Sequence, residues 1–307
     1  MGNILYNNIV IESAEELVPF ISIASLNRKE LCVNLLNETP QVDKYLSDRF
    51  GNKYEFCLKA REGIVIVLNE LRLKPDDVVT ILTTTGNSYI SGCVTKAIEK
   101  VCRWSREFTP HTKAIFVNHE FGYAYENVSE LKKYNLPIIE DCAHSFFTQS
   151  PDIGSVGDYV IYSLPKGFSM QLGGIIVYRN KLNYKCPVQI VKYIKSALEP
   201  QIGQIALFVK KRKENFNYYL HSLKDLGVYP YFKSKEGDVP GAFMFVWPEC
   251  KDYRRLKLFL NENGVDSSVF FGQDAYFIPV HHNLSINEID YICLLIHYFK
   301  EEINNKL

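Results

Sequence analysis

Acidic, imidazole and amine side chains follow two apolar segments of the sequence at positions that suit cofactor chemistry. The stretch LPIIEDCAHSFF (136–147) places Glu140 and Asp141 directly after a short apolar run, with His144 three residues further on. Lys166 lies 25 residues after Asp141, in the connection YSLPKGFSMQLGG. Each feature alone has a structural explanation, because strands end at the surface, Asp opens turns and most loop lysines face solvent.

The acid and the lysine gain a chemical meaning when they are taken together. A buried carboxylate at a strand end needs a cationic partner or hydrogen-bond donors to stay ionised. In pyridoxal phosphate chemistry, a carboxylate keeps the pyridine nitrogen protonated, which makes the ring an electron sink. A lysine forms the Schiff base and shuttles the proton. The pattern therefore predicts a pyridoxal 5'-phosphate site that uses Asp141 and Lys166.

The phosphate group of this cofactor would need a helix N-terminus and hydroxyl or guanidinium donors. The segment KAREGIVIVL (59–68) begins a predicted helix, and we expect Arg61 and the backbone of Glu62 to face the phosphate. Ser163 is a candidate for a further hydroxyl donor. The glycine pair 173–174 follows the lysine, and such pairs allow a close approach of the backbone or a positive φ angle.

Short apolar runs alternate with amphipathic ones from residue 61 onward. We expect strands where apolar and β-branched residues form continuous runs, at 77–82, 113–118, 136–140, 158–164 and 173–178. We expect helices between them, at 61–73 (stopped by Pro75), 93–102 and 127–135. This alternation predicts a mainly parallel sheet covered by helices on both faces.

Beyond residue 181 the pattern changes to that of a smaller α+β domain. It predicts a helical region broken near Pro200, strands at 242–247 and 269–271, a helix at 253–264 and a C-terminal helix. The last helix opens with Ser285 and Glu288, which have the spacing of a capping box. We therefore predict a large cofactor-binding domain at 1–180 and a small domain at 181–307.

Composition excludes several classes of protein. The 307 residues hold 35 basic and 35 acidic side chains, so no long-range field would attract nucleic acid or an anionic membrane. The densest basic run, KKRK at 210–213, is expected to be a solvated helix face. The eight cysteines form no CxxC pair and no zinc-finger spacing, which favours reduced thiols in a cytoplasmic protein without a metal site. No signal-peptide pattern or membrane-spanning apolar run is found.

The sequence resembles the DegT/DnrJ/EryC1/StrS family, the nucleotide-sugar aminotransferases with the aspartate-aminotransferase fold. The resemblance extends from about residue 55 to the C-terminus. The segments that carry it are TKAIFVNHEFG, LPIIEDCAHSF, IGSVGDYVIYSLPKGFSMQLGG, KRKENFNYYLHSL, VPGAFMFVW and IPVHHNLS. It implies the α/β architecture of pyridoxal-phosphate fold type I, a three-layer sandwich with a mainly parallel central sheet and a smaller α+β C-terminal domain. It also implies a homodimer.

The resemblance gives each candidate residue a role. Lys166 would be the Schiff-base lysine and general base, and Asp141 would pair with the pyridine nitrogen. His144 stands where the family usually has a glutamine that contacts the ring's phenolic oxygen; a simple turn histidine is the alternative. Ser163 would bind phosphate. Tyr89, in TTTGNSYIS, is the candidate for the aromatic ring stacked on the cofactor, and a core tyrosine is an equally good interpretation.

Three features depart from the family's pattern. Lys166 follows Asp158 by eight residues, against about ten in typical members. Ala60 and Arg61 replace the usual Gly-Thr or Gly-Ser before the phosphate-binding helix. The Asn-x-Arg segment that typical members send into the partner's active site is not found.

The leading functional hypothesis is a pyridoxal-phosphate-dependent aminotransferase. Glutamate would donate the amino group to a nucleotide-linked keto-deoxysugar, in cytoplasmic sugar biosynthesis for a surface polysaccharide such as the O-antigen of lipopolysaccharide. One alternative is a non-catalytic or regulatory dimer on the same fold. Another is a pyridoxal-phosphate-dependent sugar dehydratase, although those relatives have histidine where this chain has Lys166. A dinucleotide-binding protein is disfavoured, since no Gly-x-Gly-x-x-Gly follows a predicted strand.

Overall fold

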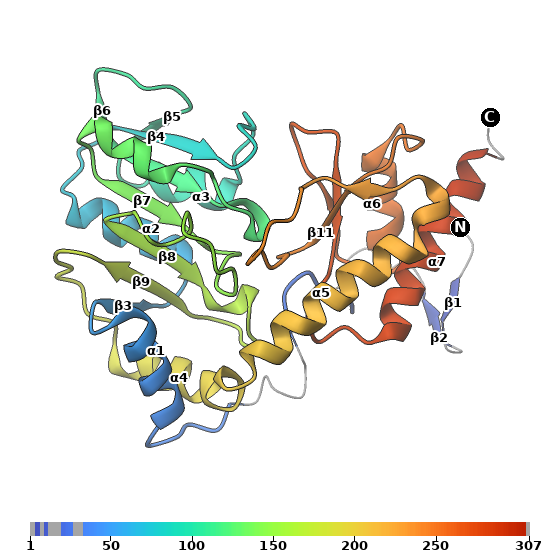
Figure 1. Cartoon of the computed structure of the whole chain (residues 1–307), viewed down its shortest axis with the longest axis horizontal. Helices are drawn as coiled ribbons and strands as arrows, with labels where there is room; N and C mark the ends of the chain where they lie inside the picture. Colours follow the sequence, from blue (N-terminus) through green and yellow to red (C-terminus); the bar gives the residue numbers. More distant parts are fainter. Residues whose placement is uncertain (1–3, 7–8, 12–19, 27–32, 305–307) are drawn as a thin grey trace. The chain divides into compact units, whose positions relative to one another are not determined.

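The chain forms two compact units (Figure 1). The computed structural model describes residues 4–6, 9–11, 20–26 and 33–304. As far as these residues are described, the first unit combines Met1–Ser25, Phe208–Ser234 and Ala242–Leu307. The second unit combines Leu26–Leu207 and Lys235–Gly241. All of the predicted site residues belong to the second unit.

The second unit is built on a seven-stranded sheet. Its strands, in spatial order, are β3 (Tyr54–Cys57), β9 (Gly174–Tyr178), β8 (Tyr159–Ser163), β7 (Ile138–Asp141), β6 (Thr112–Asn118), β4 (Val78–Thr83) and β5 (Arg103–Ser105). β9 is antiparallel to both of its neighbours, whereas all other pairs are parallel. The mainly parallel sheet predicted from the sequence is therefore confirmed.

Both faces of this sheet are buried, which explains the continuous apolar runs of its strands. The helices α2 (Ala60–Glu70) and α3 (Gly92–Ile98) cover one face, where Ala114 and Phe116 of β6 join their apolar cluster. The 3-10 helix η3 (Val128–Tyr134) covers the other face, against Ile115 and Val117. Alternate residues of one strand thus contribute to two separate clusters, as a three-layer architecture requires.

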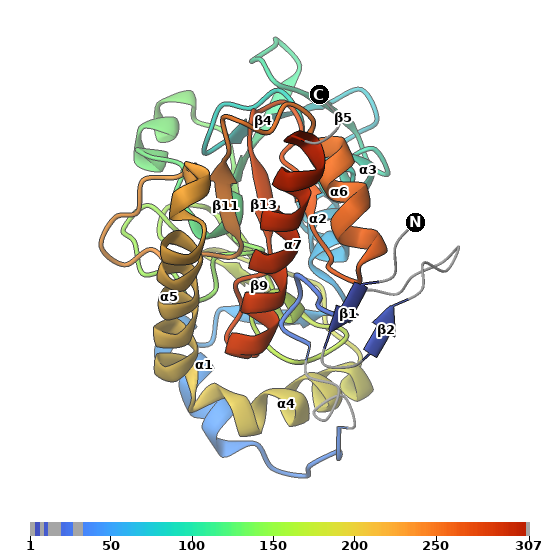
Figure 2. The ribbon, with the colours of Figure 1, turned by 90° about the vertical axis from the view of Figure 1, so that its right-hand side faces the viewer.

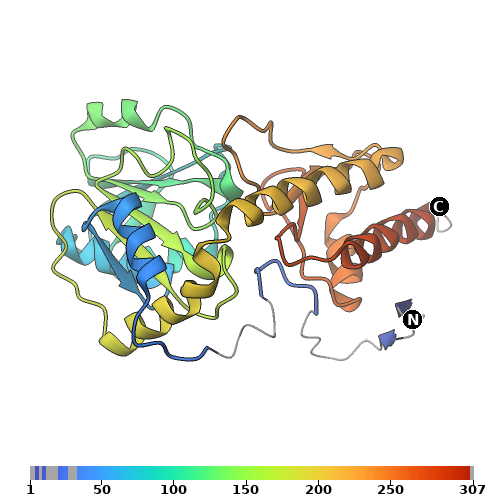
Figure 3. The ribbon, with the colours of Figure 1, turned by 60° about the horizontal axis from the view of Figure 1, so that its bottom comes forward.

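The helices α1 (Pro40–Phe50) and α4 (Val188–Ile202) lie side by side in the same unit (Figure 3). The carboxylate of Glu199 in α4 accepts hydrogen bonds from the N–H groups of Gln41 and Val42, at 3.1 and 3.0 Å, and so satisfies donors at the start of α1. The compact units change after residues 25, 207, 234 and 241, whereas a single boundary after residue 180 is predicted from the sequence.

The first unit holds a four-stranded antiparallel sheet. Its order is β10 (Tyr229–Pro230), β11 (Phe243–Val246), β13 (Tyr276–Ile278) and β12 (Ser268–Val269). Its helices are α5 (Ile205–Ser222), which begins at the end of the second unit, α6 (Tyr253–Glu262) and α7 (Ile286–Asn304), with the 3-10 helix η5 (Lys224–Leu226) and a hairpin of β1 (Ile4–Tyr6) and β2 (Ile9–Ile11). α7 runs along one face of this sheet (Figure 2).

The predicted capping box at the start of α7 is confirmed. The backbone N–H of Ser285 donates to the Glu288 carboxylate at 2.7 Å, and the N–H of Glu288 donates to the Ser285 hydroxyl at 3.3 Å. These reciprocal bonds satisfy donors that the first helical turn cannot pair internally.

Several local predictions differ from the structure. The segment 127–135 forms the 3-10 helix η3 rather than an α-helix. α2 ends at Glu70, well before Pro75, and Arg72 just beyond it has a φ angle of +57°. α4 continues through Pro200 and ends at Ile202.

The basic run at 210–213 is not uniformly solvated. Arg212 is buried, and its guanidinium donates to the hydroxyl of Ser25 at 2.7 Å. The prediction of a solvated helix face is therefore wrong for this residue, because α5 turns it toward the interior of the first unit.

Cysteine and membrane predictions can be compared with the described part of the chain. Seven cysteines there are free thiols, and Cys32 lies outside the described residues. Within the same residues, none of the helices combines the length and the apolar character that crossing a bilayer requires.

Candidate active site

A cavity of about 350 Å³ opens at the carboxyl ends of β7 and β8, beside the start of α2. Ligands of open α/β sheets bind at this edge, and the volume lies within the range of about 300–1,000 Å³ that is typical of small-molecule sites. Its lining residues are Lys59, Ala60, Arg61, Ile64, Cys93, Val94, Asp141, Ala143, Ile161, Ser163, Pro165, Lys166, Gln171 and Gly173. The cavity lies entirely within the second unit.

Asp141 is the last residue of β7 and supplies the acidic group of the cavity. Its side chain is buried, and among the described residues its carboxylate accepts one hydrogen bond, from the N–H of Ala143 at 3.0 Å. Burial raises the pKa of Asp141 from 3.8 to about 6, although the Ala143 N–H and the charge of Lys166 oppose this rise. Nearby donors and charges therefore offset only part of the cost of burying this carboxylate in its ionised form.

Lys166 reaches the same cavity from the loop that follows β8. It closes the 3-10 helix η4 (Leu164–Lys166), in which the Gly167 N–H donates to the Leu164 carbonyl at 2.9 Å. Just beyond it, Phe168 packs against Phe146 and Phe147, with ring centroids 5.1 and 5.3 Å apart. An apolar cluster therefore anchors the loop that carries the lysine.

The glycine pair 173–174 has the two properties expected of it. Gly173 has a φ angle of +132°, which side-chain-bearing residues rarely adopt. A Cβ atom at Gly174 would lie 2.7 Å from Cys57 Sγ and 2.9 Å from the backbone nitrogen of Ala60. The absence of a side chain at Gly174 therefore lets the start of α2 lie directly against the sheet, where it forms one wall of the cavity.

Four of the predicted site residues line this cavity: Arg61, Asp141, Ser163 and Lys166. The polar groups come from three separate segments, namely the start of α2, the end of β7 and the end of β8 with its loop. The fold thus brings together residues that are up to 105 positions apart in the sequence, from Arg61 to Lys166.

Glu62, His144 and Tyr89 are not among the residues that line the cavity. The N–H of Glu62 donates to the Lys59 carbonyl at 2.9 Å, so it is already engaged within the first turn of α2. The ring of His144 packs against Phe121, with centroids 5.0 Å apart. Tyr89 is 48% exposed, in the loop between β4 and α3. Their proposed contacts with the cofactor stay predictions.

Three polar residues of the cavity were not predicted from the sequence: Lys59, Cys93 and Gln171. Lys59 lies two residues before the helix predicted at 61–73, and its closeness in sequence to Arg61 was a usable signal. Cys93 and Gln171 carry no such signal, since they reach the cavity only through the packing of α3 and the return of the loop before β9.

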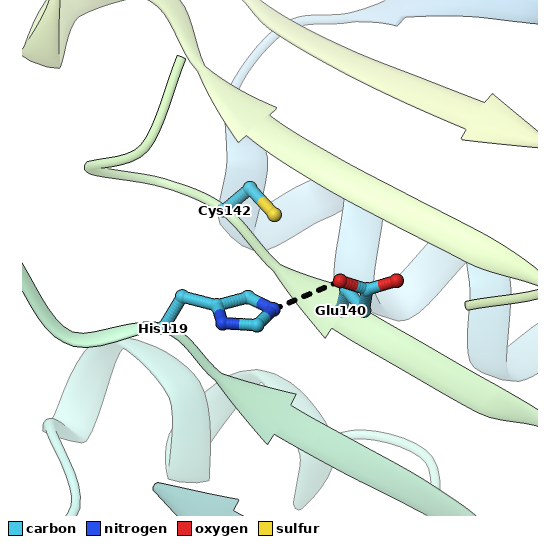
Figure 4. Close-up of side chains that lie close together, drawn as sticks. All are labelled: His119, Glu140 and Cys142. Carbon is cyan, nitrogen blue, oxygen red and sulfur yellow. Dashed lines mark hydrogen bonds and ion pairs between the residues drawn. The ribbon is translucent and has the colours of Figure 1, made fainter. Parts of the chain in front are cut away.

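His119, Glu140 and Cys142 form a buried cluster (Figure 4), and none of the three lines the cavity. Nε2 of His119 lies 2.9 Å from the Glu140 carboxylate, and its Nδ1 accepts a hydrogen bond from the N–H of Tyr125. His119 is therefore the neutral tautomer that donates through Nε2. The Glu140 carboxylate also accepts N–H groups from the loop 154–157 that leads into β8.

The pKa of Glu140 is shifted in the opposite direction to that of Asp141. Burial acts to raise the pKa of Glu140, but the hydrogen bond from His119 and the N–H groups of Gly157 and Gly154 bring it below its usual value. His119, Glu140 and Cys142 lie close enough together to suggest a metal site. The imidazole and the carboxylate are already saturated by hydrogen bonds, so we interpret the cluster as structural.

Comparisons with known proteins identify a family model and solved structures that this chain is similar to. Residues 99–188 match the model of the DegT/DnrJ/EryC1/StrS aminotransferase family. That segment contains Asp141, Ser163 and Lys166, and the resemblance found in the sequence is confirmed there. No curated protein matches the chain.

Solved structures of similar fold cover nearly the whole chain. TlmJ, an aminotransferase from Streptoalloteichus hindustanus, has 16% identity and a TM-score of 0.69, over 87% of this chain and 92% of its own. Spr1654 from Streptococcus pneumoniae, in its apo form, has 15% identity and a TM-score of 0.71, over 95% and 99%. NtdA from Bacillus subtilis with bound cofactor PMP has 16% identity and a TM-score of 0.68, over 96% and 90%. At these identities the likeness establishes the fold, and it confirms the predicted fold class.

Proposed function

We propose that the chain is a pyridoxal-phosphate-dependent sugar aminotransferase that moves an amino group from glutamate to a nucleotide-linked keto-deoxysugar. The observation that carries this proposal is the presence of Asp141 and Lys166 in one cavity of suitable volume. The family match over residues 99–188 supports the reaction class. The solved forms of Spr1654 that are named for PLP and PMP support the cofactor.

The chemistry of the cavity fits the proposed cofactor. The Asp141 carboxylate is buried and underprovided with donors, so a cationic ring N–H would satisfy it better than the described protein groups do. The other polar lining groups are mainly cationic or neutral, which suits a ligand that carries a phosphate. Pyridoxal phosphate, when bound, supplies an electron sink for charge that develops on the amino-acid carbon.

Each residue of the cavity would have its own role in the proposed reaction. Asp141 would orient the ring and hold the proton on its nitrogen. Lys166 would anchor the cofactor and then act as general base, taking the proton from the α-carbon of the amino donor and returning it during transfer. Ser163, at the end of β8, would offer its hydroxyl to the bound ligand. The loop anchored by Phe168 would hold the amine in place during these steps.

Glutamate, the nucleotide-linked sugar, a homodimer, a cytoplasmic location and a role in surface-polysaccharide synthesis all follow from the family resemblance. They remain part of the proposal.

A spectroscopic experiment tests the proposal. The purified chain mixed with pyridoxal phosphate should give a yellow complex, and borohydride should fix the cofactor's mass on the peptide that contains Lys166. Glutamate should convert the spectrum to that of the pyridoxamine form and release 2-oxoglutarate. Lys166→Ala should abolish the fixed adduct, whereas Lys132→Ala, an exposed lysine outside the cavity, should keep it. A wild-type chain that binds no cofactor would refute the proposal.

One observation favours a second candidate, a non-catalytic relative on the same fold. The start of α2 offers the methyl group of Ala60 and the charged Arg61 in place of hydroxyl-bearing residues. Such a relative would show no spectral response to glutamate or to any other amino donor. A sugar dehydratase would respond without leaving nitrogen on the sugar, and the lysine at position 166 disfavours it.

A further inference from the structure

The loop that carries Lys166 is held by a helix that follows it in the chain. The loop connects η4, which ends at Lys166, to the start of β9 at Gly174. The helix α4 comes after β9, and its residue Gln201 binds the loop from a position 32 residues beyond Ser169. The place of the lysine therefore depends on α4 as well as on the sheet.

The side chain of Gln201 binds both backbone polar groups of Ser169. Its oxygen accepts a hydrogen bond from the Ser169 N–H at 2.8 Å, and its nitrogen donates to the Ser169 carbonyl at 3.2 Å. The same nitrogen donates to the carbonyl of Ala197, one turn earlier in α4, at 2.7 Å. Gln201 is 4% exposed and Ser169 is fully buried. Loss of the amide would therefore leave buried backbone groups without these partners, which is costly.

An amide is the side-chain group that suits this contact. It offers one oxygen acceptor and two N–H donors. Here the acceptor meets an N–H group, and the donors meet the carbonyls of Ser169 and Ala197. A carboxylate at position 201 would place an acceptor against these two carbonyls. Asparagine would be one methylene group too short to span the same distance.

The same face of α4 contacts the loop at two more points. The N–H of Gln171, a residue that lines the cavity, donates to the Tyr193 hydroxyl at 3.4 Å. A Cβ atom at Gly173 would lie 3.4 Å from Cγ1 of the buried Ile194. Positions 193 and 194 lie about two helical turns before Gln201, so the three side chains share one face of the helix. This face follows the loop from Ser169 to Gly173.

We propose that Gln201 is a positioning residue that keeps the amine of Lys166 in place for bonding to the cofactor. Gln201 is not among the residues that line the cavity, so it would act through the loop alone. Ser169 lies three residues after Lys166, and the Phe168 N–H donates to the Leu164 carbonyl at 2.8 Å between them. Fixing Ser169 therefore restricts the lysine. The inference rests on the proposed function for the role of Lys166.

The test compares two ligands that differ in their need for the lysine. Pyridoxal phosphate condenses through its aldehyde with the lysine amine, with loss of one water molecule. Pyridoxamine phosphate carries an amine in place of the aldehyde and cannot form this bond. In Gln201→Met, attachment of pyridoxal phosphate to Lys166 should slow by about 10- to 100-fold, because a small misplacement of a reacting group has effects of this size. The affinity for pyridoxamine phosphate should stay close to that of the wild type.

Attachment is followed by stopped-flow absorbance, and borohydride fixation with peptide mass analysis confirms the attached residue. Calorimetry gives the affinity for pyridoxamine phosphate. Gln201→Asn serves as a second variant, because it keeps an amide but is too short to bind Ser169 in the same way. Urea unfolding shows whether each variant retains a cooperative fold.

A further measurement needs no cofactor. The Ser169 N–H donates to Gln201 in the wild type, so its amide hydrogen exchange reports this bond directly. In the cofactor-free Gln201→Met protein, this N–H should exchange at least about tenfold faster than in the wild type. Exchange at an unchanged rate would overturn the inference, whatever the cofactor does.

Gln204 provides a matched control near the same end of α4. It is exposed, and its side-chain nitrogen donates to the Pro200 carbonyl at 2.8 Å. Gln204→Met removes an amide–backbone hydrogen bond and leaves the contact between Gln201 and Ser169 in place. The attachment rate, the affinity for pyridoxamine phosphate and the Ser169 exchange rate should all equal those of the wild type.

The pair of ligands separates the possible outcomes. Slower attachment with unchanged affinity for pyridoxamine phosphate supports the inference. Equal weakening of both ligands shows that Gln201 only maintains the structure, which overturns the inference and leaves the proposed function standing. A wild-type attachment rate in both folded Gln201 variants overturns it as well. A wild-type chain that binds neither ligand overturns the proposed function, and the inference with it.

Discussion

Replacing Asp141 by asparagine should stabilise the cofactor-free protein while it disables the site. Asparagine has nearly the same shape as aspartate but carries no charge. The wild-type carboxylate is buried and accepts one hydrogen bond from the described residues, so its ionised form is poorly compensated. Removing that charge removes a penalty which the folded apo-protein bears at neutral pH.

The size and the pH dependence of this effect follow from the pKa of Asp141. Burial raises it from 3.8 to about 6 in the folded state, so the folded protein binds this proton more tightly than the unfolded chain does. The associated stability is fully present below about pH 3.8 and is lost as the pH rises through about 6. The difference corresponds to about 3 kcal/mol at most.

Urea unfolding of both apo-proteins across this pH range measures the effect. The stability advantage of Asp141→Asn should grow from below about 1 kcal/mol near pH 4 to about 3 kcal/mol near pH 8. Contributions from other titrating groups cancel in the comparison of the two proteins. Added pyridoxal phosphate should reverse the order at pH 8, since only the wild type can ion-pair with the ring nitrogen. An advantage that does not vary with pH would refute the electrostatic argument.

Three further variants test other parts of the reasoning. Glu140→Gln should lower the free energy of unfolding in urea by about 2–4 kcal/mol, because an amide replaces a carboxylate that accepts several N–H groups. A variant as stable as the wild type would contradict this role. Gly174→Ala should lower the free energy of unfolding by roughly 1–3 kcal/mol, since its Cβ would displace the start of α2. It should also weaken pyridoxal phosphate binding in an absorbance titration. Unchanged affinity would show that this close approach does not matter for the cavity. Ser285→Ala should lower the free energy of unfolding by about 1 kcal/mol without changing cofactor affinity, as expected for loss of an N-cap.

The parallel sheet could be predicted from the sequence because its strands are buried on both faces. Continuous apolar runs such as that of β6 distinguish this arrangement from a half-exposed sheet. Helix ends were less predictable, since they depend on conformation rather than on composition. The end of α2 is followed by Arg72 in the left-handed region, and α4 accommodates Pro200 near its last turn. Neither feature has a strong sequence signal.

The candidate site could be predicted to the extent that its residues lie at strand ends. Asp141 and Lys166 follow apolar runs, and the edge of the sheet brings them to one cavity. Cys93 could not be found in this way, because its place in the cavity depends on how α3 packs beside α2. The buried position of Arg212 was likewise hidden, since a run of four basic residues is more typical of a solvated helix face.

The adjacent carboxylates Glu140 and Asp141 lie on one strand but have different roles in our proposal, one structural and one in the reaction. Successive side chains of a strand point to opposite faces, so the two acids enter different environments. Glu140 meets His119 and the N–H groups of the loop 154–157, and these donors hold its pKa below the usual value. Asp141 lines the cavity and accepts one hydrogen bond from the described residues, and burial raises its pKa. The Glu140 carboxylate already has hydrogen-bond donors around it, so a ligand would add little to its stabilisation. The Asp141 carboxylate accepts one hydrogen bond from the described residues, so a cationic ligand in the cavity would stabilise its ionised form. This asymmetry is why we assign the chemistry to Asp141 and the framework of the site to Glu140.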